Sequence, residues 1–287
     1  MLLSIGGHTI SVEGSSAERF LPQFEGFKPF LTVGAVPEWS VVFGRELEEA
    51  RGKTLNEFVF KEIESECLFI REENVYSFVM KGCADGRTLV RMRYNEGMDY
   101  VEATECDNAS AFRFSLWFAF SLLSVRQRLT FVHSSTIVFR GGAVLFLGES
   151  GTGKSTHTRL WLENIEGSHL LNDDSPVLAI ENGRPMVYGS PWSGKTRCYI
   201  PYHFPLAAIV RLSQAPSNSI RLLSVPEAIA ALQPSLPPAL MQDESFADQL
   251  FAIISSTIKR VPAFHLACLP DETAARMSQE AVFRNMP

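Results

Sequence analysis

The segment after the apolar run AVLFL (143–147) reads Gly148-Glu149-Ser150-Gly151-Thr152-Gly153-Lys154-Ser155-Thr156. From Gly148 to Ser155 it satisfies the pattern G-x-x-x-x-G-K-[ST]. The apolar run predicts a buried strand, and the residues THTRLWLEN that follow predict a helix. The segment therefore joins a strand to the start of a helix, where backbone N–H groups can gather around an anion.

Each residue type in this segment has a chemical reason in a P-loop (Walker A motif). The glycines let backbone N–H groups turn inward around phosphates, Lys154 reaches the β and γ oxygens, and the Ser155 hydroxyl is a ligand for magnesium. We therefore expect ATP and Mg²⁺ to bind along Gly148–Thr156. A plain glycine-rich turn is the alternative, and the strand-to-helix context argues against it.

Two adjacent carboxylates, Asp173 and Asp174, end a short apolar stretch downstream of the loop. Such a pair suits phosphoryl transfer if Asp173 holds Mg²⁺ through water and Asp174 accepts the proton of the attacking hydroxyl. The reverse assignment stays open. A further alternative is a solvated turn before Pro176, in which both carboxylates are ordinary turn residues.

Two further side chains are candidates for the same site. His133 lies on a predicted strand beside Ser134 and Ser135, where a lone histidine is also compatible with a purely structural, hydrogen-bonded role. The turn that follows Trp192 carries Lys195, whose ammonium could reach the phosphates. An ordinary surface loop is the alternative for Lys195.

The predicted secondary structure changes along the chain. Residues 1–105 alternate short apolar runs with turn signals, which predicts a β-rich N-terminal domain of antiparallel hairpins whose role is open. A helix capped by Asp107 or Asn108 should follow and run to about Arg128. From Thr130 on, strands and helices alternate, beginning with a hairpin at a Gly-Gly turn. We expect a mixed α/β fold with domains 1–105 and 106–287.

Composition narrows the possible partners. The 287 residues carry a net charge of −6 with no run of Lys or Arg, so nucleic acid is not expected. The five cysteines are odd in number and lack a C-x-x-C pair, and the N-terminus has no signal-peptide pattern, which predicts a cytoplasmic protein. The apolar stretch 109–125 contains Arg113 and is short for a membrane span. The sequence leaves open whether the chain is a homo-oligomer.

Three motifs taken together, HSSTIV, GESGTGKST and LNDD, resemble the C-terminal catalytic domain of HPr kinase/phosphorylase. The fold of that domain is similar to ATP-dependent phosphoenolpyruvate carboxykinase. In the family a histidine stands about 15 residues before the first loop glycine, and here 148 − 133 = 15. The resemblance covers about residues 125–215. It implies transfer of the γ-phosphoryl group of ATP to a hydroxyl, most often serine of a protein, peptide or small molecule.

By similarity, His133 would face the transferred phosphate, Lys154 would bind the β and γ phosphates, and Asp174 would be the base. The family also carries a metal-binding Glu, and the nearest register here holds Pro191. This departure favours an alternative, an ATP-binding regulatory module that transfers nothing, whereas Asp173, Asp174 and His133 argue against it. An ATPase without an acceptor is also an alternative. A small-metabolite enzyme closer to the carboxykinases is a further alternative, with Lys195 and Arg197 as its nearby cations. Phosphorolysis and purine preference stay open.

Overall fold

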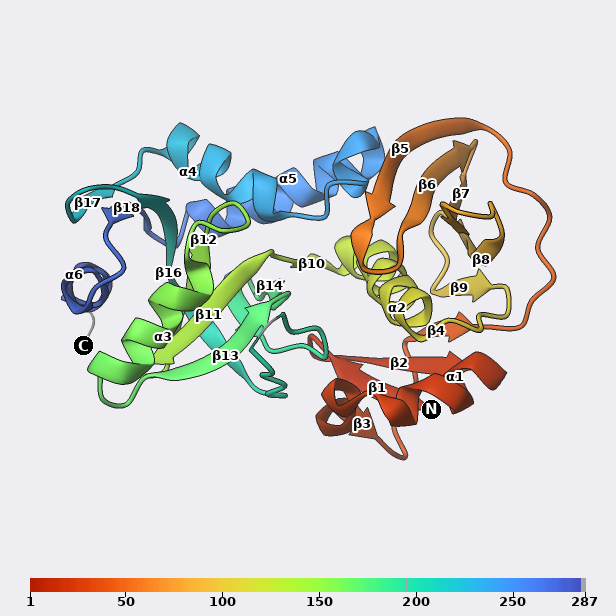
Figure 1. Ribbon diagram of the computed structural model, residues 1–287, viewed down its shortest axis with the longest axis horizontal. Helices are drawn as coiled ribbons and strands as arrows, with labels where there is room; N and C mark the ends of the chain where they lie inside the picture. The colour runs from red at the N-terminus through yellow and green to blue at the C-terminus, as the bar shows by residue number, and fades with distance from the viewer. Residues whose placement is uncertain (195, 285–287) are drawn as a thin grey trace. The chain divides into compact units, whose positions relative to one another are not determined.

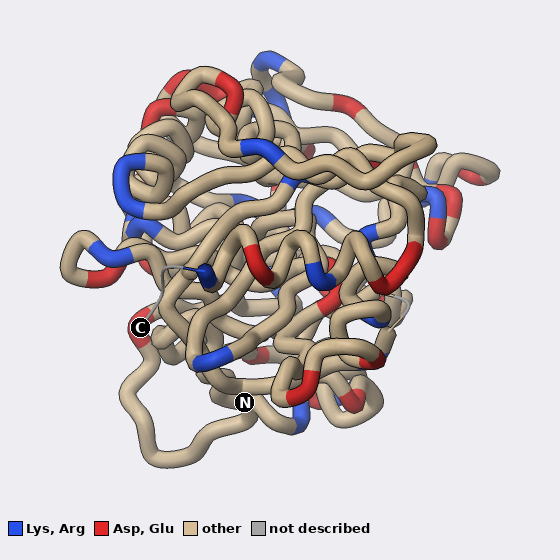
Figure 2. Tube along the Cα trace, turned by 90° about the vertical axis from the view of Figure 1, so that its left-hand side faces the viewer, with Lys and Arg blue, Asp and Glu red and all other residues tan. Residues whose placement is uncertain are grey.

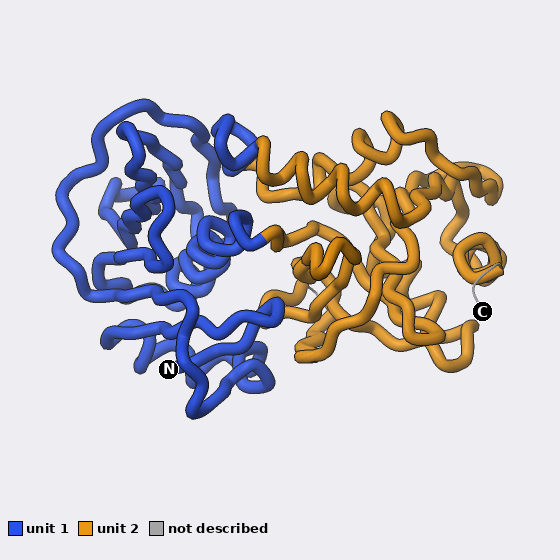
Figure 3. The backbone as a smooth tube through the Cα atoms, turned by 180° about the vertical axis from the view of Figure 1, so that it is seen from behind, with its two compact units in different colours: residues 1–127, 239–247 blue, residues 128–238, 248–287 orange. Residues whose placement is uncertain are grey.

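The computed structural model describes residues 1–194 and 196–284. The chain divides into two compact units, residues 1–127 with 239–247 and residues 128–238 with 248–287 (Figure 3). The first unit extends past the boundary expected at residue 105, because the helix α2 (Ala109–Ser124) packs on its strands. Phe118 of α2 stacks on Phe78 with the ring centroids 4.2 Å apart.

The first unit is built on one mixed sheet with the strand order β3-β1-β2-β4-β9-β8-β7-β6-β5 (Figure 1). Its strands are β1 (Leu2–Ile5), β2 (His8–Glu13), β3 (Leu31–Thr32), β4 (Trp39–Val42), β5 (Lys53–Phe60), β6 (Ser65–Glu72), β7 (Val75–Gly82), β8 (Thr88–Asn95) and β9 (Tyr100–Ala103). Its helices are α1 (Ser15–Phe20), α2, and the 3-10 helices η1 (Leu21–Gln23), η2 (Glu25–Phe30), η3 (Lys61–Ile63), η4 (Val125–Gln127) and η6 (Leu240–Gln242).

The pairing in this sheet only partly follows the antiparallel hairpins expected from the sequence. Strands β5 to β9 form an antiparallel meander, but β2 pairs β4 and β4 pairs β9 in parallel. Alternation of apolar and polar residues does not distinguish these two modes, because side chains alternate between faces in both. The predicted cap of α2 is confirmed, since the Asn108 side chain accepts a hydrogen bond from Ala111 N at 2.9 Å.

None of the helices in the described part of the chain combines the length and apolar character needed to cross a bilayer. In α2, Phe112, Leu116 and Phe118 are buried, and Arg113 is partly buried. The helix therefore serves as core of the first unit.

The second unit holds the predicted site. Its strands are β10 (Leu129–Phe131), β11 (Ser134–Phe139), β12 (Gly142–Leu147), β13 (His169–Asp174), β14 (Val177–Glu181), β15 (Arg184–Tyr188), β16 (His203–Gln214), β17 (Ser219–Leu222) and β18 (Ala263–Cys268). Its helices are α3 (Lys154–Asn164), α4 (Val225–Leu232), the 3-10 helix η5 (Gln233–Ser235), most of α5 (Glu244–Ile258) and α6 (Glu272–Phe283). Together they form a mixed α/β unit (Figure 1).

Strand β12 lies in the middle of this unit's sheet, antiparallel to β11 and parallel to β16. All of its residues are buried, as the run AVLFL predicts. The predicted hairpin is present, with a turn at Arg140 and Gly141, both at positive φ, while Gly142 already pairs with Phe139. Strand β13 pairs β11 on its other side, so β12 and β13 both end at the edge where β11 begins.

Helices α3 and α6 cover one face of this sheet. Trp161 of α3 is fully buried against Phe146 of β12 and Phe283 of α6. Helix α6 was not expected from the sequence; its N-cap is Asp271, whose side chain accepts from Ala274 N at 2.9 Å. This core fixes α3, and with it the start of the helix at Lys154.

Basic and acidic residues are interspersed on the face drawn in Figure 2. This agrees with the scattered charges of the sequence. The expected absence of a nucleic-acid partner stays a prediction.

Candidate functional site

Gly148–Gly153 form the link between β12 and α3, as expected, and Lys154, Ser155 and Thr156 lie in the first turn of α3. The three glycines of the link all have positive φ, 151° at Gly148, 86° at Gly151 and 103° at Gly153. Residues with a side chain rarely adopt these conformations, so the glycine positions of the motif match a backbone requirement of this loop. Gly153 is also the residue that caps the N-terminus of α3.

Hydrogen bonds within the segment hold the loop closed. The Thr152 hydroxyl donates to Glu149 O at 2.8 Å, and a Cβ added to Gly148 would lie 2.5 Å from this hydroxyl oxygen. The Lys154 ammonium donates to Gly148 O at 2.7 Å and to Glu149 O at 3.3 Å. Lys154 thus points across the loop toward the residues of the neighbouring strands, while the Glu149 and Ser150 side chains are exposed.

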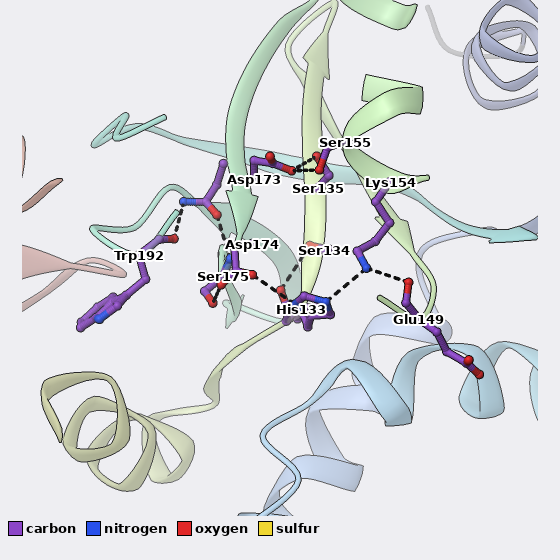
Figure 4. Close-up of polar contacts among 12 residues, drawn as sticks. His133, Ser134, Ser135, Glu149, Lys154, Ser155, Asp173, Asp174, Ser175 and Trp192 are labelled. Atoms are coloured by element: carbon purple, nitrogen blue, oxygen red, sulfur yellow. Dashed lines mark hydrogen bonds and ion pairs between the residues drawn. The ribbon is translucent and has the colours of Figure 1, made fainter. Parts of the chain in front are cut away.

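The loop opens on a polar pocket of about 360 Å³. The structure brings to this pocket His133, Lys154, Ser155, Asp173 and Asp174, which are distant in sequence (Figure 4). They come from three places that meet at one sheet edge: the link before β11, the start of α3, and the end of β13. The grouping predicted from the sequence is therefore present as a spatial cluster.

Asp173 is buried beneath the loop and accepts several hydrogen bonds. Its Oδ1 accepts from the Ser135 hydroxyl at 2.7 Å and from the Ser155 hydroxyl at 3.0 Å. Its Oδ2 accepts from Thr196 N at 3.4 Å. Hydrogen bonds of this kind stabilise a carboxylate in a buried setting. They also hold Asp173 directly beside the serine expected to bind magnesium.

Asp174 lies at the same strand end but faces the pocket, with 39% of its side chain exposed. Its Oδ2 accepts from the Ser175 hydroxyl at 2.7 Å, and its Oδ1 lies 3.4 Å from His133 Nδ1. The adjacent aspartates therefore occupy different environments. Asp173 is anchored in the fold, whereas Asp174 is open to a bound molecule.

His133 stands between Lys154 and Asp174 (Figure 4). Its Nε2 lies 3.2 Å from Lys154 Nζ, and its backbone N donates to Ser235 O at 2.7 Å. With Lys154 as donor, Nε2 is the acceptor and Nδ1 carries the proton toward Asp174, an assignment made from the hydrogen-bond network. The residue lies in the link between β10 and β11, directly before the strand on which it was expected.

The Lys154 ammonium is half-buried, and burial lowers its pKa below the ordinary value. The carboxylates of Asp174 and Asp173 act in the opposite direction and favour the charged form. An ammonium with little water around it interacts strongly with an anion placed in the pocket.

Several residues that support this cluster were not singled out in the sequence. Buried Asn172 donates through Nδ2 to Trp192 O at 3.2 Å and accepts through Oδ1 from Ser175 N at 2.9 Å. Gly194 N donates to Asp173 O at 2.6 Å, and a Cβ on Gly194 would lie 2.8 Å from that oxygen. The turn after Trp192 is thus fitted against the aspartate pair. The sequence placed this turn near the site only through the neighbouring Lys195, which lies outside the described residues.

A second pocket, of about 660 Å³, adjoins the same loop. Gly151, Gly153 and Thr156 line both pockets. The rest of the second pocket is formed by helix α3 and by the ends of β16 and β18, and includes the side chains Leu160, Leu212, Gln214, Cys268, Leu269 and Pro270. The loop is therefore flanked by a charged pocket and a more apolar one.

No family model matches the chain, and no curated protein matches it in sequence. Among solved structures, the HPr(Ser) kinase/phosphatase from Coxiella burnetii is similar, with 15% sequence identity and a TM-score of 0.32. The match covers 54% of this chain and 94% of that one. A similarity at this level carries no argument about activity, substrate or cofactor.

Proposed function

We propose that this chain is an ATP- and Mg²⁺-dependent phosphotransferase that moves the γ-phosphoryl group to a hydroxyl. The observation that carries the proposal is the pocket in which Lys154, Ser155, Asp173 and Asp174 meet beside a loop with glycines at positive φ. A glycine-rich turn without a ligand would need neither the lysine nor the carboxylates at this place. In-line phosphoryl transfer gives each of them a role, the lysine and the serine at the phosphates and metal, and the carboxylates at the metal and the acceptor hydroxyl.

The two pockets on either side of the loop suggest how the nucleotide lies. The phosphates would bind the backbone N–H groups of the loop and the start of α3, with the γ group beside Lys154. The nucleoside would then extend into the second pocket, between Leu212 and Pro270. An apolar pocket with a few polar groups, such as Gln214, is typical of small-molecule sites.

The oxygen atoms at the loop suit a magnesium ion. The Ser155 hydroxyl would be a direct ligand, and Asp173, 3.0 Å from it, would bind through water. Among the described residues no group of three or more His, Cys, Asp or Glu could hold a metal alone. This pattern fits magnesium, which usually keeps several waters and shares its coordination with substrate phosphates. Magnesium would neutralise charge on the transferring phosphates.

The remaining chemistry belongs to the side chains of the pocket. Lys154 would turn from the loop carbonyls to the β and γ oxygens, because phosphate is the stronger acceptor. Asp174, exposed to the pocket and adjacent to His133, would accept the proton of the acceptor hydroxyl. His133 would orient Asp174 through Nδ1 and face the transferred phosphate. Positioning and charge neutralisation would supply most of the rate acceleration.

The acceptor is proposed as serine in a protein, peptide or small molecule, on the resemblance of the three motifs to HPr kinase/phosphorylase. Lys195 is proposed to approach the phosphates from the turn after Trp192, which lies against the aspartate pair through Gly194.

The test is transfer of label from γ-labelled ATP with Mg²⁺, using a cell extract and a panel of hydroxyl compounds as acceptors. The Asp174→Asn variant is the matched control. Label on a protein, peptide or small molecule with the wild type alone supports the proposal. Label only in free phosphate would make the chain an ATPase, and binding without any release of label would make it a nucleotide-dependent regulatory module. Either outcome would overturn the proposed transfer.

A further inference from the structure

A separate pocket of about 310 Å³ lies in the second unit, between the strands β16, β17 and β18 and the helix α4. Arg211, Arg221 and His265 line it together with Glu227, Leu223, Ala230 and Ala231. None of these residues lines either pocket at the glycine-rich loop. Arg211 and His265 are directly paired neighbours on the parallel strands β16 and β18, so their side chains leave the sheet on the same face.

Arg211 is half-buried and unpaired. Within residues 1–194 and 196–284 its guanidinium makes no hydrogen bond and no ion pair. None of its nitrogens is both buried and unpartnered, so they are open to water and to a ligand that enters the pocket. The pocket thus holds a donor group with unused hydrogen-bonding capacity.

The Glu227 carboxylate in the pocket does not pair with Arg211, because both of its oxygens accept hydrogen bonds from other residues. Glu227 Oε1 accepts from Arg221 at 2.7 Å. Its Oε2 accepts from Ser224 N at 2.9 Å and from the Ser224 hydroxyl at 2.8 Å, which closes the cap of α4. The opposite charges of Arg221 and Glu227 therefore offset each other, and the charge of Arg211 remains without a partner among the described residues.

His265 completes the cluster. Its Nε2 is 2.9 Å from the Ser213 hydroxyl. Burial lowers the pKa of His265 most, the positive charges of Arg221 and Arg211 lower it further, and Glu227 opposes them. His265 is the register partner of Arg211 on β16 and of Arg221 on β17, so the three side chains leave the sheet on one face and an anion there would meet nitrogen donors from all three.

We propose that this pocket binds a small anion, a phosphate or carboxylate group, with Arg211 as its principal ligand and His265 and Arg221 beside it. The planar guanidinium matches either group with two parallel hydrogen bonds. Leu223 and Ala231 form part of the apolar lining of the pocket. A bound anion stabilises the imidazolium form of His265, so binding is coupled to uptake of one proton from solvent. The proposal does not depend on nucleotide binding at the loop.

The test follows the side-chain nitrogens of His265 by NMR in the full-length protein, with inorganic phosphate and acetate as separate probes. The His265→Gln variant assigns the signals. The Lys154→Ala variant controls for phosphate at the glycine-rich loop. Arg276→Gln, which removes an arginine outside the pocket, is the matched control for Arg211→Gln.

The proposal predicts saturable shifts of the His265 signals and a higher His265 pKa on anion binding, in the wild type, Lys154→Ala and Arg276→Gln alike. Arg211→Gln should weaken binding by about tenfold or more, since a hydrogen bond to a charged group is lost. In the absence of anion the same variant should raise the His265 pKa. A response to phosphate alone or to acetate alone identifies the preferred group.

Three results would overturn the proposal. They are no saturable shift with either anion, an equal shift in Arg211→Gln, or a shift that disappears in Lys154→Ala and so arises at the loop. If Arg211→Gln does not fold, phosphate binding is measured by calorimetry on the single variant Lys154→Ala and on the double variant Lys154→Ala with His265→Gln. Equal heats in these two proteins would then refute the site.

Discussion

Replacing Asp173 and Asp174 one at a time with asparagine distinguishes the role of a general base from that of a residue that holds Mg²⁺. Asp174 is exposed to the pocket and contacts His133, whereas Asp173 is buried under Ser135 and Ser155. If Asp174 is the general base, Asp174→Asn keeps the shape of the side chain but cannot accept the proton. Turnover should fall by roughly 10²- to 10⁴-fold, with affinity for ATP and Mg²⁺ nearly unchanged.

The effect of Asp173→Asn follows from its three hydrogen bonds. The amide oxygen can still accept from Ser135 and Ser155, but the amide NH₂ would face the N–H of Thr196. Losing this charge-assisted contact should destabilise the fold by about 1–3 kcal/mol. That is less than the ~5–15 kcal/mol stability of a typical domain, so the variant should fold. The Mg²⁺ concentration for half-maximal activity should rise, and excess Mg²⁺ should partly restore turnover.

The assay is turnover as a function of Mg²⁺ concentration for the wild type and both variants, with thermal unfolding as the control for folding. Rescue of Asp173→Asn alone supports the assignment. Rescue of Asp174→Asn by Mg²⁺, with none for Asp173→Asn, would show that the roles are reversed. Wild-type turnover in both variants would refute the site.

Three further changes test the loop, its support and the core. Gly148→Ala should abolish ATP binding, because the new methyl would lie 2.5 Å from Thr152 Oγ1, and calorimetry would show whether binding survives. Asn172→Ala should destabilise the fold by roughly 1–3 kcal/mol, measured by denaturant unfolding, because the buried hydrogen bonds of the Asn172 amide to Trp192 O and from Ser175 N are lost. Burial lowers the pKa of His157 to about 4, so the unfolded chain binds more protons than the folded one between about pH 4 and pH 6.5. Stability should therefore fall as the pH drops through this window, by an amount on the order of 3 kcal/mol in total, and His157→Gln should remove this part of the slope.

The local features of the second unit were predictable because each has a short-range cause. The apolar run before Gly148 requires a buried strand, and the glycines at 148, 151 and 153 fit a loop with positive φ. The hairpin before it and, in the first unit, the cap of α2 at Asn108 also depend only on neighbouring residues. These elements were found at or near their expected places.

The features that were missed depend on contacts between distant segments. The hydroxyl of Ser135 reaches Asp173 because β11 pairs β13, and a single sequence does not give that pairing. The parallel contacts of β4 and the pocket around Arg211 arise in the same way. Helix α6 had a recognisable cap at Asp271, but its core-facing residues are mostly small, so its apolar pattern is weak.

Binding of ATP, ADP and AMP in the presence of Mg²⁺ to the wild type and to Lys154→Ala, measured by calorimetry, tests the central claim most directly. Lys154 is the cation expected to contact the β and γ oxygens. The account predicts that the wild type binds ATP and that Lys154→Ala weakens ATP binding by roughly 10- to 100-fold, while AMP binding changes little. An equal loss for ATP and AMP, or no binding of ATP to the wild type, would contradict it.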